Sequence, residues 1–172
     1  MQWSIGRLFV PPSLFERPRG FLHRARRFRA ARRYAAHGWT VQRRGEAVLL
    51  VTGSELDALE VPATWGSRAD RRGPVAVTAT GRWIFLVRPG TPLRPELDRR
   101  LDVVRHGPGS WIAVAPSRLP EGPVRWAVTP GKTRWRLPDA EVVQRMLVEA
   151  LAAGPVRRPV VPRQLSTSRR AA

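Results

Sequence analysis

The sequence predicts an α+β fold, in which a mostly antiparallel sheet has a basic helix before it and another helix after it. Two apolar, β-branched runs at 75–78 and 83–87 flank a Thr-Gly link, which is the pattern of a β-hairpin with buried strands. Shorter apolar runs separated by turn residues continue the sheet on both sides of this hairpin. Apolar residues at helical spacing mark the two ends of the chain, near 22–35 and 142–151.

The first helix is expected over residues 20–37. Its apolar residues recur every three or four positions and predict a stripe that packs on a core: Leu22, Ala25, Phe28, Ala31 and Ala35. Arginines occupy the remaining faces: Arg24, Arg26, Arg27, Arg29, Arg32 and Arg33. Gly38 follows at a position where glycine commonly ends a helix.

The strands are expected in one sheet that spans residues 39–126. Strands at 39–41 and 47–52 flank a turn at 43–46, and a strand at 56–61 ends at Pro62. Side-chain alternation puts Leu56, Ala58 and Glu60 on one face of this last strand. After the hairpin, strands are expected at 101–105, 111–115 and 123–126, and we place 111–115 in the same sheet as the hairpin.

The second helix is expected from Asp139, as its N-cap, to residue 153, and Gly154-Pro155 ends it. The chain is thereby divided into an irregular leader at 1–19, a single domain at 20–154 and a basic disordered tail at 155–172.

The composition excludes several classes of protein. The chain of 172 residues has no cysteine, which excludes disulfides and thiolate metal sites and fits a cytoplasmic location. No apolar run approaches the roughly 18 residues that would cross a bilayer, so we expect no membrane partner.

The charge favours a polyanionic partner. The formal net charge is +18, and the excess lies at the ends: residues 1–33 hold nine Arg and one acid, and residues 155–172 hold five Arg and no acid. A basic helix face attracts phosphates, so Arg24, Arg26, Arg27, Arg29, Arg32 and Arg33 are the candidate residues for binding DNA or RNA. The competing interpretation is a solvated helix surface encoded by a GC-rich gene.

Composition and spacing reveal no catalytic constellation, and we expect neither a cofactor nor a metal. Gly131-Lys132-Thr133 lacks the earlier glycine of a phosphate-binding loop, because Trp126 stands there. The three histidines, at 23, 37 and 106, are not at ligand spacing. The tryptophans within apolar strands are assigned to core packing rather than to base stacking: Trp39, Trp83, Trp111 and Trp126.

An ordered series of short motifs resembles one known family. The series is Ala35-Ala-His-Gly-Trp39, Leu50-Val-Thr-Gly53, Leu56-Asp-Ala-Leu-Glu-Val-Pro62, Gly73-Pro-Val75, Thr80-Gly-Arg-Trp-Ile-Phe-Leu86, Gly109-Ser-Trp-Ile-Ala-Val-Ala-Pro-Ser117, Val124-Arg-Trp126 and Trp135-Arg-Leu-Pro-Asp139. Over roughly residues 30–153 this resembles the bifunctional DNA primase/polymerase N-terminal (prim-pol) domain of the archaeo-eukaryotic primase superfamily. The resemblance implies a reduced RRM-like primase-polymerase core.

The family's chemistry, as the resemblance implies it, is two-metal nucleotidyl transfer, with an Asp-x-Asp pair, a third acid and a histidine. This chain departs from that pattern at each position. It has Glu60 and Pro62 where the paired acids are expected, Arg82-Trp83 in place of Arg-His, and His106 in place of the third acid. We therefore regard Glu60, Pro62, Arg82, Trp83 and His106 as degenerate pocket positions, and we expect no catalytic residue.

The sequence thus leads to a non-catalytic, primase/polymerase-like protein that binds nucleic acid through its Arg-rich flanks. One alternative is an active metal-dependent nucleotidyltransferase that uses the remaining acids Asp57, Glu60 or Asp102. Another alternative is a protein-interaction module that binds no nucleic acid.

Overall fold

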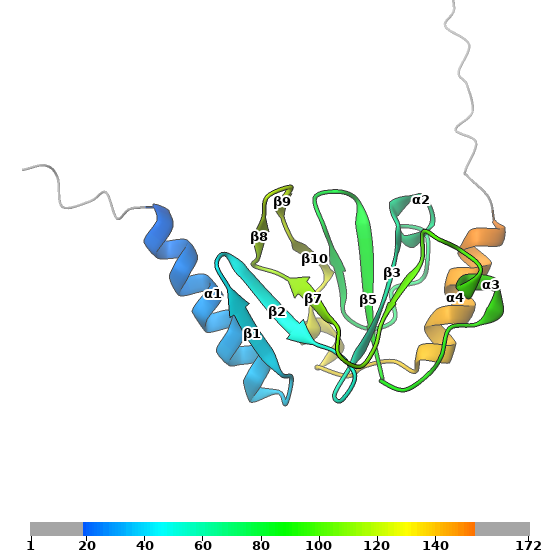
Figure 1. Ribbon diagram of the computed structural model, residues 1–172, viewed down its shortest axis with the longest axis horizontal. Coiled ribbons are helices and arrows are strands. Elements are labelled where there is room, and N and C mark those ends of the chain that lie inside the picture. The colour runs from blue at the N-terminus through cyan, green and yellow to red at the C-terminus, as the bar shows by residue number, and fades with distance from the viewer. Residues whose placement is uncertain (1–18, 154–172) are drawn as a thin grey trace, which may run out of the picture.

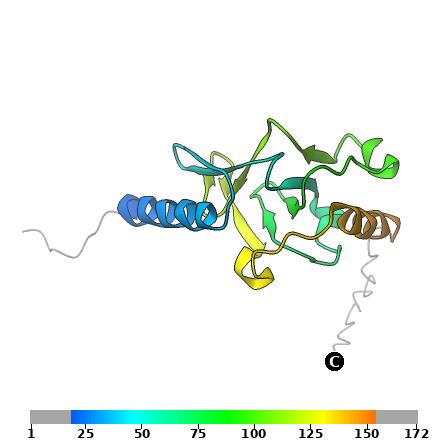
Figure 2. The ribbon, with the colours of Figure 1, turned by 90° about the horizontal axis from the view of Figure 1, so that it is seen from below.

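The computed structural model of the protein describes residues 19–153 as a layered α+β structure (Figure 1). A long helix lies at one end, followed by a three-stranded sheet, a five-stranded sheet and a group of three helices at the other end. Seen from below, the first and last helices again lie at opposite ends (Figure 2). The α+β class and the predominance of antiparallel pairing are confirmed.

Helix α1 (Arg19–Ala36) confirms the first predicted helix, but the predicted apolar stripe is only partly right. Ala31 and Tyr34 are buried, whereas Leu22 and Phe28 are 49% and 47% exposed. The buried face of the helix therefore includes Tyr34, which was not part of the predicted apolar stripe. Phe28 is instead covered by guanidinium groups, with Arg32 and Arg43 at 5.9 and 5.2 Å from its ring centre.

The three-stranded sheet lies next to α1 and has the order β1-β2-β7, with antiparallel pairing throughout. Its strands are β1 (Val41–Arg44), β2 (Ala47–Val51) and β7 (Trp111–Val114). The turn between β1 and β2 is shorter than predicted, since Arg43 and Arg44 still pair with Val48 and Ala47.

The five-stranded sheet has the order β10-β4-β5-β3-β6 and is also antiparallel throughout. Its strands are β3 (Asp57–Pro62), β4 (Val75–Val77), β5 (Arg82–Val87), β6 (Val104–His106) and β10 (Arg125–Val128). The predicted hairpin is confirmed, because Val75 pairs with Phe85 and Val77 pairs with Trp83. Two short helices interrupt the strands, α2 (Ala63–Gly66) after β3 and α3 (Pro95–Asp98) after β5.

The prediction of one sheet that includes residues 111–115 is wrong. Both edges of the hairpin are occupied by other strands, since β10 pairs with β4 and β3 pairs with β5. The segment 111–115 supplies β7, which pairs with β2 instead. A third, two-stranded sheet is formed by β8 (Arg118–Leu119) and β9 (Gly122–Pro123).

The five-stranded sheet separates two hydrophobic cores, and the alternation predicted for β3 is confirmed. Ala58, Ile84 and Leu86 pack with the three-stranded sheet and with α1. Leu59 and Phe85 point to the opposite face and pack with α2, α3 and helix α4 (Ala140–Ala152). Each face of the sheet is therefore covered, and polar residues on either face must find partners.

The C-terminal helix α4 begins as predicted. The Asp139 side chain accepts a hydrogen bond from the Glu141 backbone N–H at 2.8 Å, which is the interaction of an N-cap. The 3₁₀ helix η1 (Pro130–Thr133) stands between β10 and α4, at a place where the sequence indicated a loop.

The predicted leader, and the predicted tail at 155–172, lie outside the described residues, apart from Arg19 at the start of α1. Within the part that the structure describes, no helix is long and apolar enough to cross a bilayer.

Candidate functional site

The structure brings together three of the five degenerate pocket positions that the family resemblance indicated. Glu60 on β3 lies between Arg82 on β5 and His106 on β6, because β3 is the strand between the other two. Arg82 Nε donates a hydrogen bond of 2.7 Å to Glu60 Oε1. His106 Nε2 lies 2.9 Å from Glu60 Oε2 and donates to it, since an ionised carboxylate can only accept.

Hydrogen bonds and neighbouring charges favour the ionised form of Glu60 despite its limited access to water. Its side chain is 20% exposed. The hydrogen bond from His106 and then those from Arg82 lower the pKa of Glu60, and these effects outweigh the desolvation that would raise it. The carboxylate is therefore already neutralised by side chains of the protein.

The other two positions do not join this cluster. Trp83 points to the opposite face of the sheet, where its ring centre lies 6.4 Å from that of Phe85. Arg71 lies over the Trp83 ring at 5.2 Å. Pro62 pairs with Arg82 at the end of β3 and offers no side-chain oxygen. Trp83 is thus a packing residue in this structure.

Ser110 extends the cluster and was not found by sequence reasoning. Its Oγ lies 3.1 Å from His106 Nδ1, which gives the order Ser110, His106, Glu60 along one hydrogen-bonded chain. This is the order of nucleophile, base and carboxylate in hydrolases. Here, however, the carboxylate is also bound by Arg82, whose Nη2 donates to the Asp102 carbonyl at 2.8 Å. In the sequence, the spacing of four residues between His106 and Ser110 was the only feature that could have indicated this contact.

The remaining acids of the alternative enzyme hypothesis do not gather around Glu60. Asp57 points to the other face of β3, is 2% exposed, and accepts hydrogen bonds from Arg105 Nη2 at 2.7 Å and from the Gly90 N–H at 3.1 Å. Asp102 is paired with Arg100 at 2.9 Å. Among the described residues, no group of three His, Cys, Asp or Glu side chains is placed to hold a metal ion.

The six candidate arginines at 24–33 of α1 are not equivalent. The Arg27 side chain is only 13% exposed and forms an ion pair with Glu46 at 3.2 Å, so it belongs to the packing of α1 on the β1–β2 hairpin. Arg32 is held over Phe28 and Arg33 over Trp135, the latter at 5.4 Å. Within residues 19–153, Arg27 is the only one of the six with a carboxylate partner.

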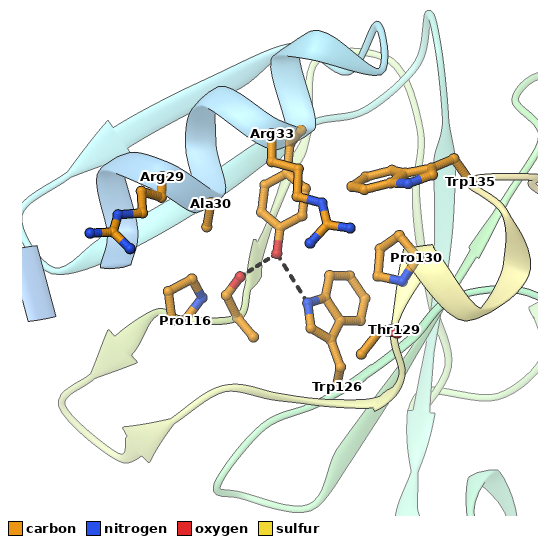
Figure 3. Close-up of a pocket in the computed structure, with 11 residues that line it drawn as sticks. Arg29, Ala30, Arg33, Pro116, Trp126, Thr129, Pro130 and Trp135 are labelled. Atoms are coloured by element: carbon orange, nitrogen blue, oxygen red, sulfur yellow. Dashed lines mark hydrogen bonds between the residues drawn. The ribbon is translucent and has the colours of Figure 1, made fainter. Parts of the chain in front are cut away.

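Two of these arginines border a pocket of about 420 Å³ between α1 and the segment around η1 (Figure 3). Arg29 and Arg33 come from successive turns of α1, and the Arg33 guanidinium points into the space between Trp126 and Trp135. The complete lining is Arg29, Ala30, Arg33, Tyr34, Ala115, Pro116, Trp126, Thr129, Pro130, Gly131 and Trp135. Most of this surface is apolar, with the charge at its border.

Hydrogen bonds and aromatic contacts fix the walls of the pocket. Tyr34 donates its hydroxyl to the Ala115 carbonyl and accepts from Trp126 Nε1 at 3.0 Å. Burial, as the largest effect, raises the pKa of Tyr34. Trp135 meets Tyr34 edge to face at 6.1 Å, and His37 stacks on it at 3.6 Å.

Sequence reasoning did not find this pocket. Trp126 was assigned to the core, yet it is only half-buried and faces the pocket. Of the other strand tryptophans, Trp39 is buried as predicted, whereas Trp111 is 51% exposed, which contradicts the prediction for it. In the sequence, Tyr34 could have indicated this pocket, because it follows Ala31 by three positions and so lies on the buried face of α1.

The chain was compared with protein-family models, with curated proteins and with solved structures, and none of the three comparisons found a match.

Proposed function

We propose that this protein is a non-catalytic, primase/polymerase-like protein that binds nucleic acid through its Arg-rich surface. The observation that carries the proposal is the arginine face of α1, where five of the six arginines at 24–33 have no carboxylate partner within residues 19–153. Such a single-sign face repels itself and is stabilised by a polyanion. Phosphates are the polyanion that arginine binds best, often with two hydrogen bonds each.

The relationship to the prim-pol domain is supported by the order of the elements. Along the chain, a β-α-β-β-α-β arrangement is formed by β3, α2, β4, β5, α3 and β6. In the sheet, its strands have the order β4-β5-β3-β6. That is the topology expected of an RRM-like core. The positions that the resemblance indicated for catalysis on three separate strands also lie together, at Glu60, Arg82 and His106.

The absence of catalysis is supported by the charges at those positions. Two divalent ions need several carboxylates to offset their charge. Glu60 is one carboxylate, and both of its oxygens already accept hydrogen bonds from Arg82 and His106. A metal ion would have to displace a guanidinium group that is also bound to the Asp102 carbonyl.

A binding titration with DNA and RNA at two salt concentrations tests the proposal. Salt-sensitive binding without nucleotide incorporation supports it. Incorporation that requires magnesium or manganese would favour the nucleotidyltransferase alternative, in which Glu60 still binds metal. No binding at about 50 mM salt, where phosphate contacts are strong, would favour a protein-interaction module.

A further inference from the structure

We propose that the pocket between α1 and η1 accepts one unpaired base of a single-stranded nucleic acid, with Arg29 and Arg33 on its phosphates. This inference rests on the proposed function and adds a preference for single strands, which an arginine face alone does not give. Contacts to phosphates position a nucleic acid but are made with duplexes and single strands alike.

The size and lining of the pocket fit a base. Its volume of about 420 Å³ lies within the range of roughly 300–1,000 Å³ that is usual for small-molecule sites. Proteins that bind single strands combine aromatic side chains, on which bases stack, with a positively charged groove. The half-buried Trp126 and the buried Pro130 offer the apolar surface here, and Arg29 and Arg33 offer the charge.

The two arginines are placed to receive a phosphate next to the bound base. They are four residues apart on α1 and therefore lie on the same face of the helix. Arg33 is held in position by its contact with the Trp135 ring, at 5.4 Å. Neither of them pairs with a carboxylate of the described residues, so both are available to an anion.

The wall formed by Trp135 is held in an unusual backbone conformation. Arg134 and Trp135 are consecutive non-glycine residues with φ of 52° and 62°, a region that bulky residues rarely adopt. Such conformations persist where the surrounding structure enforces them, and they concentrate at ligand sites. Here Tyr34, His37 and Trp39 pack around the Trp135 ring and fix it before any ligand binds.

A paired base cannot use this pocket. In a duplex the faces of each base are covered by its neighbours, and a base reaches a protein pocket only when it leaves the stack at an energetic cost. Single strands avoid most of this cost, so the pocket predicts tighter binding to a single strand than to a duplex of the same length.

The first test fills the pocket without changing the charge. Ala30 is half-buried and lines the pocket, whereas Ala35 is exposed on the same helix, so Ala30→Leu and Ala35→Leu form a matched pair. The ligands are a thymidine strand and a uridine strand of about 12 nucleotides, within the roughly 4–16 that one small domain covers, and a duplex of equal length. Adenosine monophosphate serves as the free nucleotide.

We expect Ala30→Leu to weaken binding of both strands by about tenfold, the range of one lost stacking contact, and to change duplex binding less than twofold. Ala35→Leu should leave all affinities unchanged. The ratio of the two strand affinities then identifies DNA or RNA as the source of the base. Adenosine monophosphate that binds as tightly as a strand would overturn the proposal in favour of a free-nucleotide site.

A second pair keeps the proposal testable if Ala30→Leu does not fold. Arg29→Ala/Arg33→Ala removes the charges at the pocket, and Arg24→Ala/Arg26→Ala removes equal charge elsewhere on α1. The pocket variant should lose about fivefold more single-strand affinity than its control. Equal losses for both variants, on strand and duplex alike, would contradict the pocket and leave the proposed function standing. A wild-type protein that binds no nucleic acid would contradict the proposed function itself.

Discussion

Glu60 is the residue at which the structure bears most directly on chemistry. Because hydrogen bonds from His106 and Arg82 lower its pKa from the ordinary value of 4.5, its contribution to stability is fully present above about pH 4.5. That contribution is lost as the pH falls through the lowered pKa of the folded state, where the carboxylate takes up a proton. Acid should therefore weaken this cluster before the apolar cores.

We expect Glu60→Gln to lower the free energy of unfolding at pH 7 by about 1 kcal/mol, because two charge-assisted hydrogen bonds are lost at a partly hydrated site. As the pH falls below 4.5 the difference from wild type should shrink, since the stability that comes from the lowered pKa of Glu60 is then progressively lost. Urea denaturation at pH 7 and at pH 3.5 measures both values. Glu96→Gln is the control at an exposed site. A difference that is the same at both pH values would contradict this account of the cluster.

At this scale the sequence predicted part of the cluster and missed part of it. The family resemblance indicated Glu60, Arg82 and His106, and the pairing of β3, β5 and β6 places them side by side. Ser110 and the Arg82 contact to the Asp102 carbonyl depend on loop geometry, which no residue pattern encodes. Trp83 was indicated with the cluster, but side-chain alternation turns it to the other face.

Helix α1 is the element on which the proposed binding of nucleic acid depends. Its length and position were predictable from periodicity, but the identity of its buried face was not, because Ala and Arg dominate the segment and both tolerate several environments. The contacts of Arg27 with Glu46 and of Tyr34 with Trp126 fix that face. We therefore expect Arg27 to contribute to the packing of α1 rather than to contacts with phosphates.

We expect Arg26→Ala/Arg29→Ala/Arg33→Ala to weaken duplex binding and to flatten the log–log salt dependence by about three, since each phosphate contact contributes roughly one. The loss should be uniform across sequences, because phosphate contacts carry no base information. The control Arg99→Ala/Arg125→Ala/Arg145→Ala removes the same charge from exposed positions outside α1. Salt titrations of both variants measure the two slopes. Equal flattening by the control would show that binding depends on the total charge of the protein rather than on the arginines of α1.

The strand at 111–115 illustrates what the sequence could not settle among elements. Its apolar run predicted a strand, and a strand is present as β7. The choice of partner depends on which edges are free, and those of the hairpin are taken by β3 and β10. Which strand pairs with which edge is therefore decided only when the whole sheet is assembled.

At the scale of the whole molecule, the five-stranded sheet carries the Glu60 cluster on one face and a packed helical layer on the other. The clustering of helices at the two ends was predictable from the order of the periodic segments. The pocket beside α1 was not, because it joins residues about a hundred positions apart, such as Ala30 and Trp135. Local patterns carry no information about such contacts.

We expect no template-dependent primer synthesis or extension with magnesium or manganese. The physical reason is that Glu60 is already neutralised and Asp57 points to the opposite face of β3, so they cannot share a metal. Incorporation of labelled nucleotides into a primed template measures this directly. Metal-dependent incorporation by the wild type that disappears in Glu60→Gln would establish an active enzyme instead.

The salt dependence of binding to duplex DNA tests the central claim most directly. The arginines at 24–33 and those at 157–170 number eleven, and if half of them neutralise phosphates, the log–log slope should be about −5. We predict that slope for the wild type between about 50 and 200 mM salt, with little dependence on sequence. An absence of binding at about 50 mM salt, or a slope near zero, would contradict the claim that this protein binds nucleic acid.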